Sequence, residues 1–214
     1  MAAANLLRKI ARKGSNPSKI AAEVIHCQGL IEVVVEGLGA KQPSVKYGCE
    51  KVLRKIGEMQ PDLLYPYFDF LIAMLDCENC FLKWGAIHDI ANLTRVDGAG
   101  NFELIFDKYY APISGPVMIT AATIIGASAR IALAKPLLAE RIVTEILKVE
   151  SAEYKTPECR NVAIGHAIDS FDQFFDHVRR KGRIVQFVKR QLQNSRTPVR
   201  KRAEKFLKKR KIPC

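Results

Sequence analysis

Leu82-Lys83-Trp84-Gly85-Ala86 is one of five stretches of this sequence that share one pattern. Each begins with an apolar residue, most continue with a cation, and a small residue follows the cation slot by three positions. The other four are Val45-Lys46-Tyr47-Gly48-Cys49, Met118-Ile119-Thr120-Ala121-Ala122, Cys159-Arg160-Asn161-Val162-Ala163 and Val199-Arg200-Lys201-Arg202-Ala203. The small residues are separated by 37, 36, 41 and 40 residues. A recurring unit of this length predicts a solenoid, in which each helix pair buries its apolar face against the next.

Prolines and hydrophobic periodicity divide each unit into two helices. Pro43, Pro116, Pro157 and Pro198 each precede an expected second helix by one or two residues, as is typical of the segments that lead into helices. Apolar residues recur with the helical period, and no alternating stretch requires a strand. The predicted fold is therefore all-α, a right-handed α-solenoid of about five helix pairs in a single domain, 1–214. Its expected parts are an amino-terminal basic cap, 1–17, and repeat units 18–60, 61–97, 98–134, 135–180 and 181–214.

The last of the five stretches carries a family resemblance. Pro198 to Leu207 resembles the second helix of a HEAT repeat, and similar stretches cover roughly residues 20 to 211. HEAT and armadillo units run to about 40 to 47 residues, whereas tetratricopeptide and ankyrin units are shorter. The chain thus resembles the HEAT-repeat (armadillo-like) superfamily. This resemblance implies a binding or adaptor scaffold with a concave face lined by second helices, and no particular member is indicated.

Composition agrees with an intracellular protein. With 214 residues and 48% apolar content, the chain can bury a sizeable core. No secretory signal is visible at the amino terminus, and the most apolar stretch, 117–134, is interrupted by polar residues and Arg130, so we expect no transmembrane segment and a cytoplasmic location. Cys77-Glu78-Asn79-Cys80 has the spacing of a metal or redox pair, but no second pair accompanies it. A turn with two reduced thiols is the preferred interpretation, with no metal.

Charge is unevenly distributed. The formal net charge is +12, of which residues 179–214 contribute fifteen cations against the single acid Glu204. This segment is predicted to bind a polyanion or to serve as the polar cap that solenoids need. A nucleic acid would be held there by phosphate neutralisation, without base reading. The candidate polyanion-binding residues are Arg196, Arg200, Lys201, Lys205, Lys208 and Lys209.

Two further sets of residues are candidates for contact with a protein or peptide partner. Tyr47 and Trp84 occupy the same slot in adjacent units, so stacking would place them side by side, and Asn161 holds that slot in the fourth unit. Asp169, Asp172 and Asp176 follow one another at i, i+3 and i+7 and share one helix stripe. The stripe is predicted to be compensated by the neighbouring cations at 179–181, with a basic peptide or a bound cation as alternatives.

Catalytic signatures are missing from the sequence. It has no nucleotide-binding glycine loop, nucleophile elbow or zinc-protease motif, so we predict a non-enzymatic scaffold with no cofactor, binding a protein or peptide. The alternative is a nucleic-acid-binding protein. Within that alternative the chain resembles the HEAT-like DNA glycosylases for alkylated bases in size, basicity and the presence of Trp84 and Asp89. Those two side chains point about 140 degrees apart on an ideal helix, which disfavours a shared active site.

Overall fold

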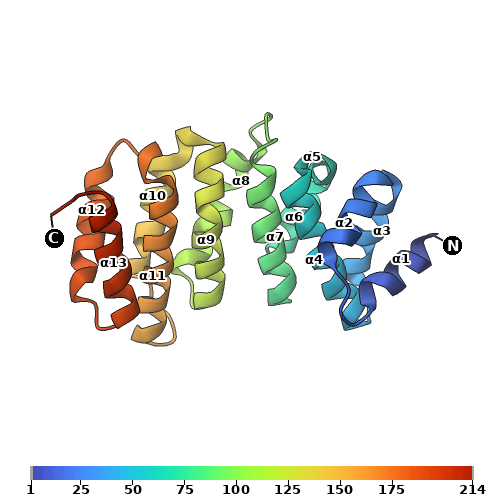
Figure 1. The fold of residues 1–214 in the computed structure, drawn as a ribbon, viewed down its shortest axis with the longest axis horizontal. Coiled ribbons are helices and arrows are strands. Elements are labelled where there is room, and N and C mark those ends of the chain that lie inside the picture. Colours follow the sequence, from blue (N-terminus) through green and yellow to red (C-terminus); the bar gives the residue numbers. More distant parts are fainter. Residues whose placement is uncertain (1, 214) are drawn as a thin grey trace. The chain divides into compact units, whose positions relative to one another are not determined.

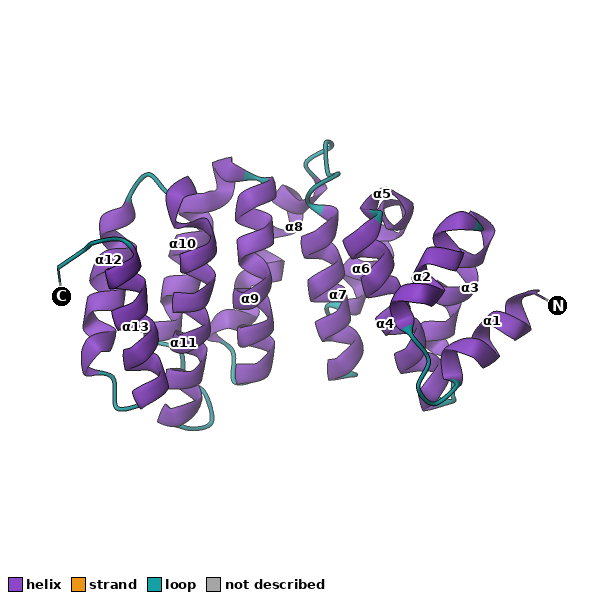
Figure 2. Ribbon diagram, viewed as in Figure 1, coloured by secondary structure: helices purple, strands orange, loops and turns teal. Residues whose placement is uncertain are grey.

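The computed structural model describes residues 2–213, and all regular structure in that range is α-helix or short 3-10 turn (Figure 1, Figure 2). The all-α prediction is confirmed. Internal contacts group the chain into two compact units, one ending at Phe102 and one beginning at Glu103; we call them unit 1 and unit 2. The expected repeat 98–134 begins before this division, and the outermost expected boundaries, 1 and 214, lie outside the described residues.

Unit 1 consists of helices packed in successive pairs. They are α1 (Ala2–Ala11), α2 (Pro17–His26), α3 (Ile31–Glu36), α4 (Pro43–Met59), α5 (Pro61–Leu64), α6 (Phe68–Met74) and α7 (Cys80–Leu93). The long helix α4 packs against α1 and α2 on one side and against α7 on the other, while α6 packs against α7. Short 3-10 turns extend the first helices, such as Gly37–Gly39 after α3 and Tyr65–Tyr67 between α5 and α6. The second helices α4 and α7 therefore share one interface.

Unit 2 repeats this arrangement. Helix α8 (Asn101–Tyr110) begins in the last residues of unit 1 and is followed by α9 (Met118–Ala134), α10 (Ala139–Leu147), α11 (Pro157–Phe174), α12 (Lys181–Arg190) and α13 (Thr197–Lys209). Here α9 packs against α11, and α11 and α12 pack against α13. The second helices α9, α11 and α13 thus form a layer in which each contacts the next.

Polar caps and prolines start the second helices at defined residues. The side chain of Asn79 accepts hydrogen bonds from the backbone N–H groups of Phe81 and Leu82, at 3.1 and 3.3 Å. Thr156 accepts one from Cys159 at 3.2 Å. Proline occupies the first turn of α4, α11 and α13, where its missing N–H costs no helical hydrogen bond. These starts fix which residues of each second helix face outward.

Four of the five small residues of the repeated pattern are buried at helix interfaces: Cys49, Ala86, Ala163 and Ala203. Burial raises the pKa of the Cys49 thiol to about 11, as expected for a core cysteine. The third stretch departs from the prediction, because Ala122 is only half-buried and Ala121 is the fully buried residue. Helix α9 is apolar on most of its surface, so its sequence fits more than one register.

Candidate functional site

Three aromatic side chains form a continuous row on α4 and α7 of unit 1. The ring centroids of Tyr47 and Phe81 are 5.5 Å apart, and those of Phe81 and Trp84 are 5.4 Å apart. Phe81 is 62% exposed, and its two neighbours are half-buried. We call Tyr47, Phe81 and Trp84 the aromatic row. It presents rigid apolar area to solvent, which is the usual composition of a binding hot spot.

The start of α7 positions this row. Asn79 caps the helix with its side-chain oxygen and donates a hydrogen bond from Nδ2 to the hydroxyl of Tyr47 at 3.1 Å. One side chain therefore sets both the first turn of α7 and the orientation of the Tyr47 ring. The sequence placed Tyr47 and Trp84 together but missed Phe81, which lies between them. Its signal was available, since Phe81 is three residues before Trp84 and so shares its helix face.

Three cations lie close to the aromatic row in the sequence. Lys46 and Lys51 lie on α4 and Lys83 lies on α7, and none of them forms an ion pair with the residues that the structure describes. The buried acid of this region, Glu50, is paired with Arg54 on the same helix. The row thus combines exposed rings with positive charge that the protein itself leaves unbalanced.

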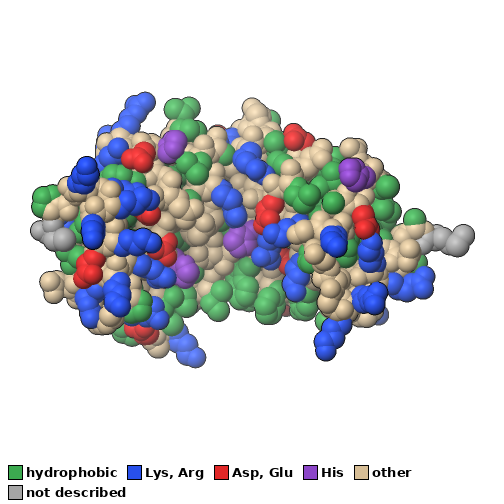
Figure 3. Space-filling view, viewed as in Figure 1, with side chains coloured by type: hydrophobic (Ala, Val, Ile, Leu, Met, Phe, Trp, Pro, Cys, Tyr) green, Lys and Arg blue, Asp and Glu red, His purple; other side chains and the backbone are tan. Residues whose placement is uncertain are grey.

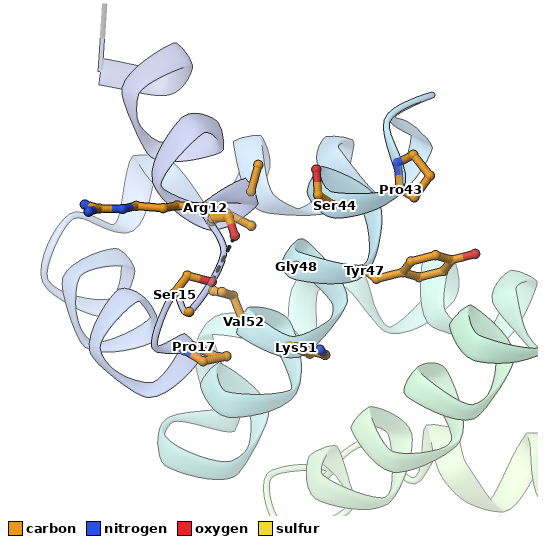
Figure 4. Close-up of a pocket in the computed structure, with 12 residues that line it drawn as sticks. Arg12, Ser15, Pro17, Pro43, Ser44, Tyr47, Gly48, Lys51 and Val52 are labelled. Atoms are coloured by element: carbon orange, nitrogen blue, oxygen red, sulfur yellow. Dashed lines mark hydrogen bonds between the residues drawn. The ribbon is translucent and has the colours of Figure 1, made fainter.

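A pocket of about 420 Å³ adjoins the row at Tyr47 (Figure 4). It lies between the end of α1, the start of α2 and the first turns of α4, and Ile10, Pro17, Pro43 and Val52 are among its apolar lining residues. Ser15 closes one side, where its hydroxyl donates a hydrogen bond to the carbonyl of Ile10 at 3.0 Å. The pocket is large enough for a side chain of a bound peptide.

In unit 2, the three aspartates of the predicted stripe are compensated within the protein. Asp169 and Asp172 lie on α11, and Asp176 lies in the 3-10 turn Phe175–His177 that follows it. Asp169 pairs with Arg202 at 3.0 Å, Asp172 pairs with Lys209 at 3.0 Å and also with Arg210, and Asp176 lies 3.7 Å from Lys181. Burial alone would raise the pKa of Asp172, but the hydrogen bonds from Lys209 and Arg210 outweigh burial and lower that pKa below its usual value. Of the expected partners at 179–181, only Lys181 takes part; α13 supplies the others.

Asn161 is also engaged internally. Its amide nitrogen donates to the hydroxyl of Ser195 at 2.9 Å, and its oxygen accepts from Asn194 at 3.0 Å. These bonds hold the turn that precedes α13. His166 follows Asn161 by five residues on the same helix, and its pKa is lowered by burial and by the charge of Arg202. Asn161 therefore uses its polar side-chain atoms within unit 2.

The candidate polyanion-binding residues separate into two groups. Arg196 pairs with Glu158 at 2.5 Å, Arg200 donates to the carbonyls of Asn194 and Ser195, and Lys209 pairs with Asp172. Lys201, Lys205 and Lys208 are exposed and form no ion pair with any residue in the range 2–213. Figure 3 shows Lys and Arg side chains gathering over the end of unit 2 that holds α12 and α13.

Comparison with known proteins identifies the architecture. No protein-family model and no curated protein matches this sequence. A designed armadillo repeat protein in complex with the peptide (KR)4 aligns with 97% of this chain and 90% of its own, at a TM-score of 0.55 and 16% identity. The alignment with a second designed armadillo repeat protein covers 94% of this chain and 90% of that protein, with a TM-score of 0.53 and 15% sequence identity. The alignment with an engineered protein from the Northeast Structural Genomics Consortium covers 98% of this chain and 89% of that protein, with a TM-score of 0.53 and 15% sequence identity.

The fold is an armadillo/HEAT-like repeat. The predicted superfamily resemblance is thereby confirmed at the level of fold.

Within this armadillo/HEAT-like fold, the residues that suggested catalysis lie apart. Asp89 is 3% exposed and lies next to Gly57 in the core of unit 1, whereas Trp84 lies in the aromatic row. Cys77 donates to the carbonyl of Asn79 at 3.2 Å, and Cys80 is exposed at the first position of α7. No group of three or more potential metal ligands occurs among the described residues. None of the helices described is both long and apolar enough to cross a membrane.

Proposed function

We propose that this protein is a non-enzymatic repeat scaffold that binds a protein or peptide partner through the aromatic row of unit 1. The observation that supports this proposal most directly is the exposure of Phe81 between two further rings. Leaving a phenylalanine 62% exposed forgoes roughly 1 kcal/mol or more of burial free energy, which a partner would recover on binding.

The surroundings of the row favour an extended peptide. The pocket beside Tyr47 can receive one side chain, and the rings of Phe81 and Trp84 offer stacking area further along. The lysines close to the row in the sequence favour acidic residues in the peptide, because opposite charges accelerate and orient association. The designed armadillo protein that carries a bound peptide supports the idea that such folds present peptide-binding faces.

Four of the residues expected to contact a partner are not part of this proposal. The polar atoms of Asn161, Asp169, Asp172 and Asp176 are used within unit 2. A partner that used them would first have to break those contacts. The proposed site therefore consists of Tyr47, Phe81 and Trp84, with Lys46, Lys51 and Lys83 close to them in the sequence.

Peptide selection tests this proposal. Peptides are selected on the intact protein from a displayed random 12-residue library and measured by calorimetry against Phe81→Ala and Trp84→Ala. We expect each substitution to weaken binding by about tenfold or more, as for hot-spot aromatics. Phe70→Ala is the matched control, since Phe70 is an exposed phenylalanine on α6 of the same unit. Selected peptides that bind both row variants as tightly as the original protein would refute the proposed site.

A further inference from the structure

The cations in and next to α12 and α13 fall into two groups: those that form ion pairs within the protein and those that do not. The used cations face the acids of neighbouring helices: Lys181, Arg190, Arg196, Arg202, Lys209 and Arg210 pair with Asp176, Glu150, Glu158, Asp169 and Asp172. The pairs of Lys181 and Arg190 hold α12, and the other pairs hold α13 and its two ends to α11. Their charge is already balanced, so they are poorly placed to attract an external anion.

Lys201, Lys205 and Lys208 remain on the outer surface of α13. They are spaced i, i+4 and i+7, which places them on one helix face, with about 6 Å and then about 4.5 Å of rise between them. All three are exposed, and no acid within the described chain pairs with them. We call them the lysine ridge. Glu204 is the one acid on this helix, and it forms no ion pair with the ridge.

The helix beneath the ridge is held firmly. Val199, Ala203, Phe206 and Leu207 are buried, and the guanidinium of Arg210 lies 4.6 Å from the ring of Phe175 and 4.0 Å from that of Phe206. Asp172 pairs with the same guanidinium. The three ammonium groups therefore extend from a fixed backbone, and like charges at i and i+4 are mildly unfavourable there without a counter-charge.

We propose that the lysine ridge docks on the phosphate backbone of a double-stranded nucleic acid, without reading its bases. A regular line of unbalanced cations matches a regular line of phosphates, and charge alone suffices for such binding. A protein partner would need apolar anchors beside the charges, and an anionic membrane surface would need apolar side chains to insert. Helix α13 has none of the large exposed apolar side chains of the described chain, so both alternatives are disfavoured.

Salt dependence tests this inference. Binding of the intact protein to a DNA duplex of about 20 base pairs is measured by filter retention between about 50 and 200 mM salt. Each lost phosphate contact lowers the magnitude of the slope of log K against log salt by about 0.9. The triple variant Lys201→Ala, Lys205→Ala, Lys208→Ala should therefore lower it by roughly 2 to 3. The matched control, Arg179→Ala, Arg180→Ala, Lys189→Ala, removes the same charge from unit 2 outside α13 and should lower it by less than about 1.

Several outcomes would overturn the inference. They are no duplex binding at low salt, an equal loss in both triple variants, or binding through the ridge to polyglutamate or to phosphatidylserine vesicles that the duplex does not displace. The inference is independent of the proposed peptide site. Phe81→Ala and Trp84→Ala should leave duplex binding unchanged, so failure of one proposal can be told from failure of the other.

Discussion

At the scale of single residues, the packing of second helices depends on positions where a side chain would not fit. Gly85 is the clearest case. A Cβ atom at this position would lie 2.7 Å from the Oε1 atom of Glu50 and 2.8 Å from its Cγ atom. Glu50 is buried and held by Arg54, so it has little room to move. Glycine at position 85 thus allows α7 to approach α4.

Gly85→Ala should consequently destabilise the protein. Overpacking costs about 1 to 3 kcal/mol, of which the better helix propensity of alanine returns up to about 1 kcal/mol. Urea unfolding should therefore show a lower midpoint. The control is Gly126→Ala in α9, where a Cβ atom would meet nothing within 4 Å and where the midpoint should stay or rise. Equal effects of the two substitutions would show that the contact with Glu50 is unimportant.

The sequence predicted the buried small residue correctly in four of the five repeated stretches. Cys49, Ala86, Ala163 and Ala203 are buried as the repeat pattern indicated. It was wrong by one residue in α9, because a helix that is apolar nearly all round gives no unique register. Phe81 was missed for a different reason: a phenylalanine outside the repeated pattern looks like core, although its spacing of three residues from Trp84 placed it on the same helix face.

At the scale of elements, the interface between α11 and α13 is tied by Asp172. The pKa of this carboxyl is lowered in the folded protein by Lys209 and Arg210. A carboxyl with a lowered folded pKa contributes stability above its unfolded pKa, near 4, and that contribution is lost as the pH falls through the folded value. The ion pairs of α13 should therefore weaken in acid.

Asp172→Asn should lower the free energy of unfolding by about 1 kcal/mol at pH 7, since the pair is partly exposed and screened. At pH 3 and below the difference should shrink, because the original carboxyl is then becoming protonated. Urea titrations at several pH values measure this. Asp176→Asn is the control, because Asp176 is exposed and its partner Lys181 is 3.7 Å away. If the loss of unfolding free energy in Asp172→Asn does not depend on pH, the effect comes from packing and not from the charge of Asp172.

The partners of the aspartate stripe illustrate what sequence periodicity cannot provide. Periodicity predicted that Asp169, Asp172 and Asp176 share one helix stripe and that the cations at 179–181 compensate them. In the structure Asp169 and Asp172 lie on α11, and Asp176 lies in the 3-10 turn after it. Asp169 and Asp172 pair with cations that lie about 33 to 38 residues later in the sequence, at α13. Such pairs depend on which helix packs alongside, and that follows from tertiary packing of the repeats, which a helical period alone does not specify.

At the scale of the whole molecule, the net charge of +12 opposes the binding of a cationic peptide. The similar designed protein was solved with the peptide (KR)4. In the present chain the three aspartates of the predicted stripe already bind cations of α12 and α13, and three lysines lie close to the aromatic row in the sequence. Long-range repulsion should add to these local effects at low ionic strength.

We therefore expect no saturable binding of (KR)4, with a dissociation constant weaker than about 1 mM. Calorimetric titration of the intact protein at low salt, repeated at high salt, measures this. A saturable isotherm that disappears when Asp169, Asp172 and Asp176 are all changed to Asn would contradict the expectation. The same titration with the three aspartates intact also checks whether their internal pairs can be displaced.

The general architecture was accessible from the sequence, and the expected five repeat boundaries remain predictions. Periodicity, prolines and the repeat spacing together indicated stacked helix pairs, which the alignment with armadillo repeat proteins supports. The kind of partner was harder to predict from the sequence, because a fold of this kind constrains the residues at buried positions strongly and those at exposed positions weakly. The useful clues to function were exposed rings and unbalanced charges, which became visible only with the helices in place.

The aromatic row has one practical consequence. Trp84 is the only tryptophan of the chain, and it is half-buried at the edge of the ring of Phe81. When tryptophan is excited selectively over the six tyrosines, its emission spectrum therefore reports the polarity and quenching at this one position. The protein thus carries an intrinsic optical probe at the surface proposed for its partner, and ligands can be screened there without any attached dye.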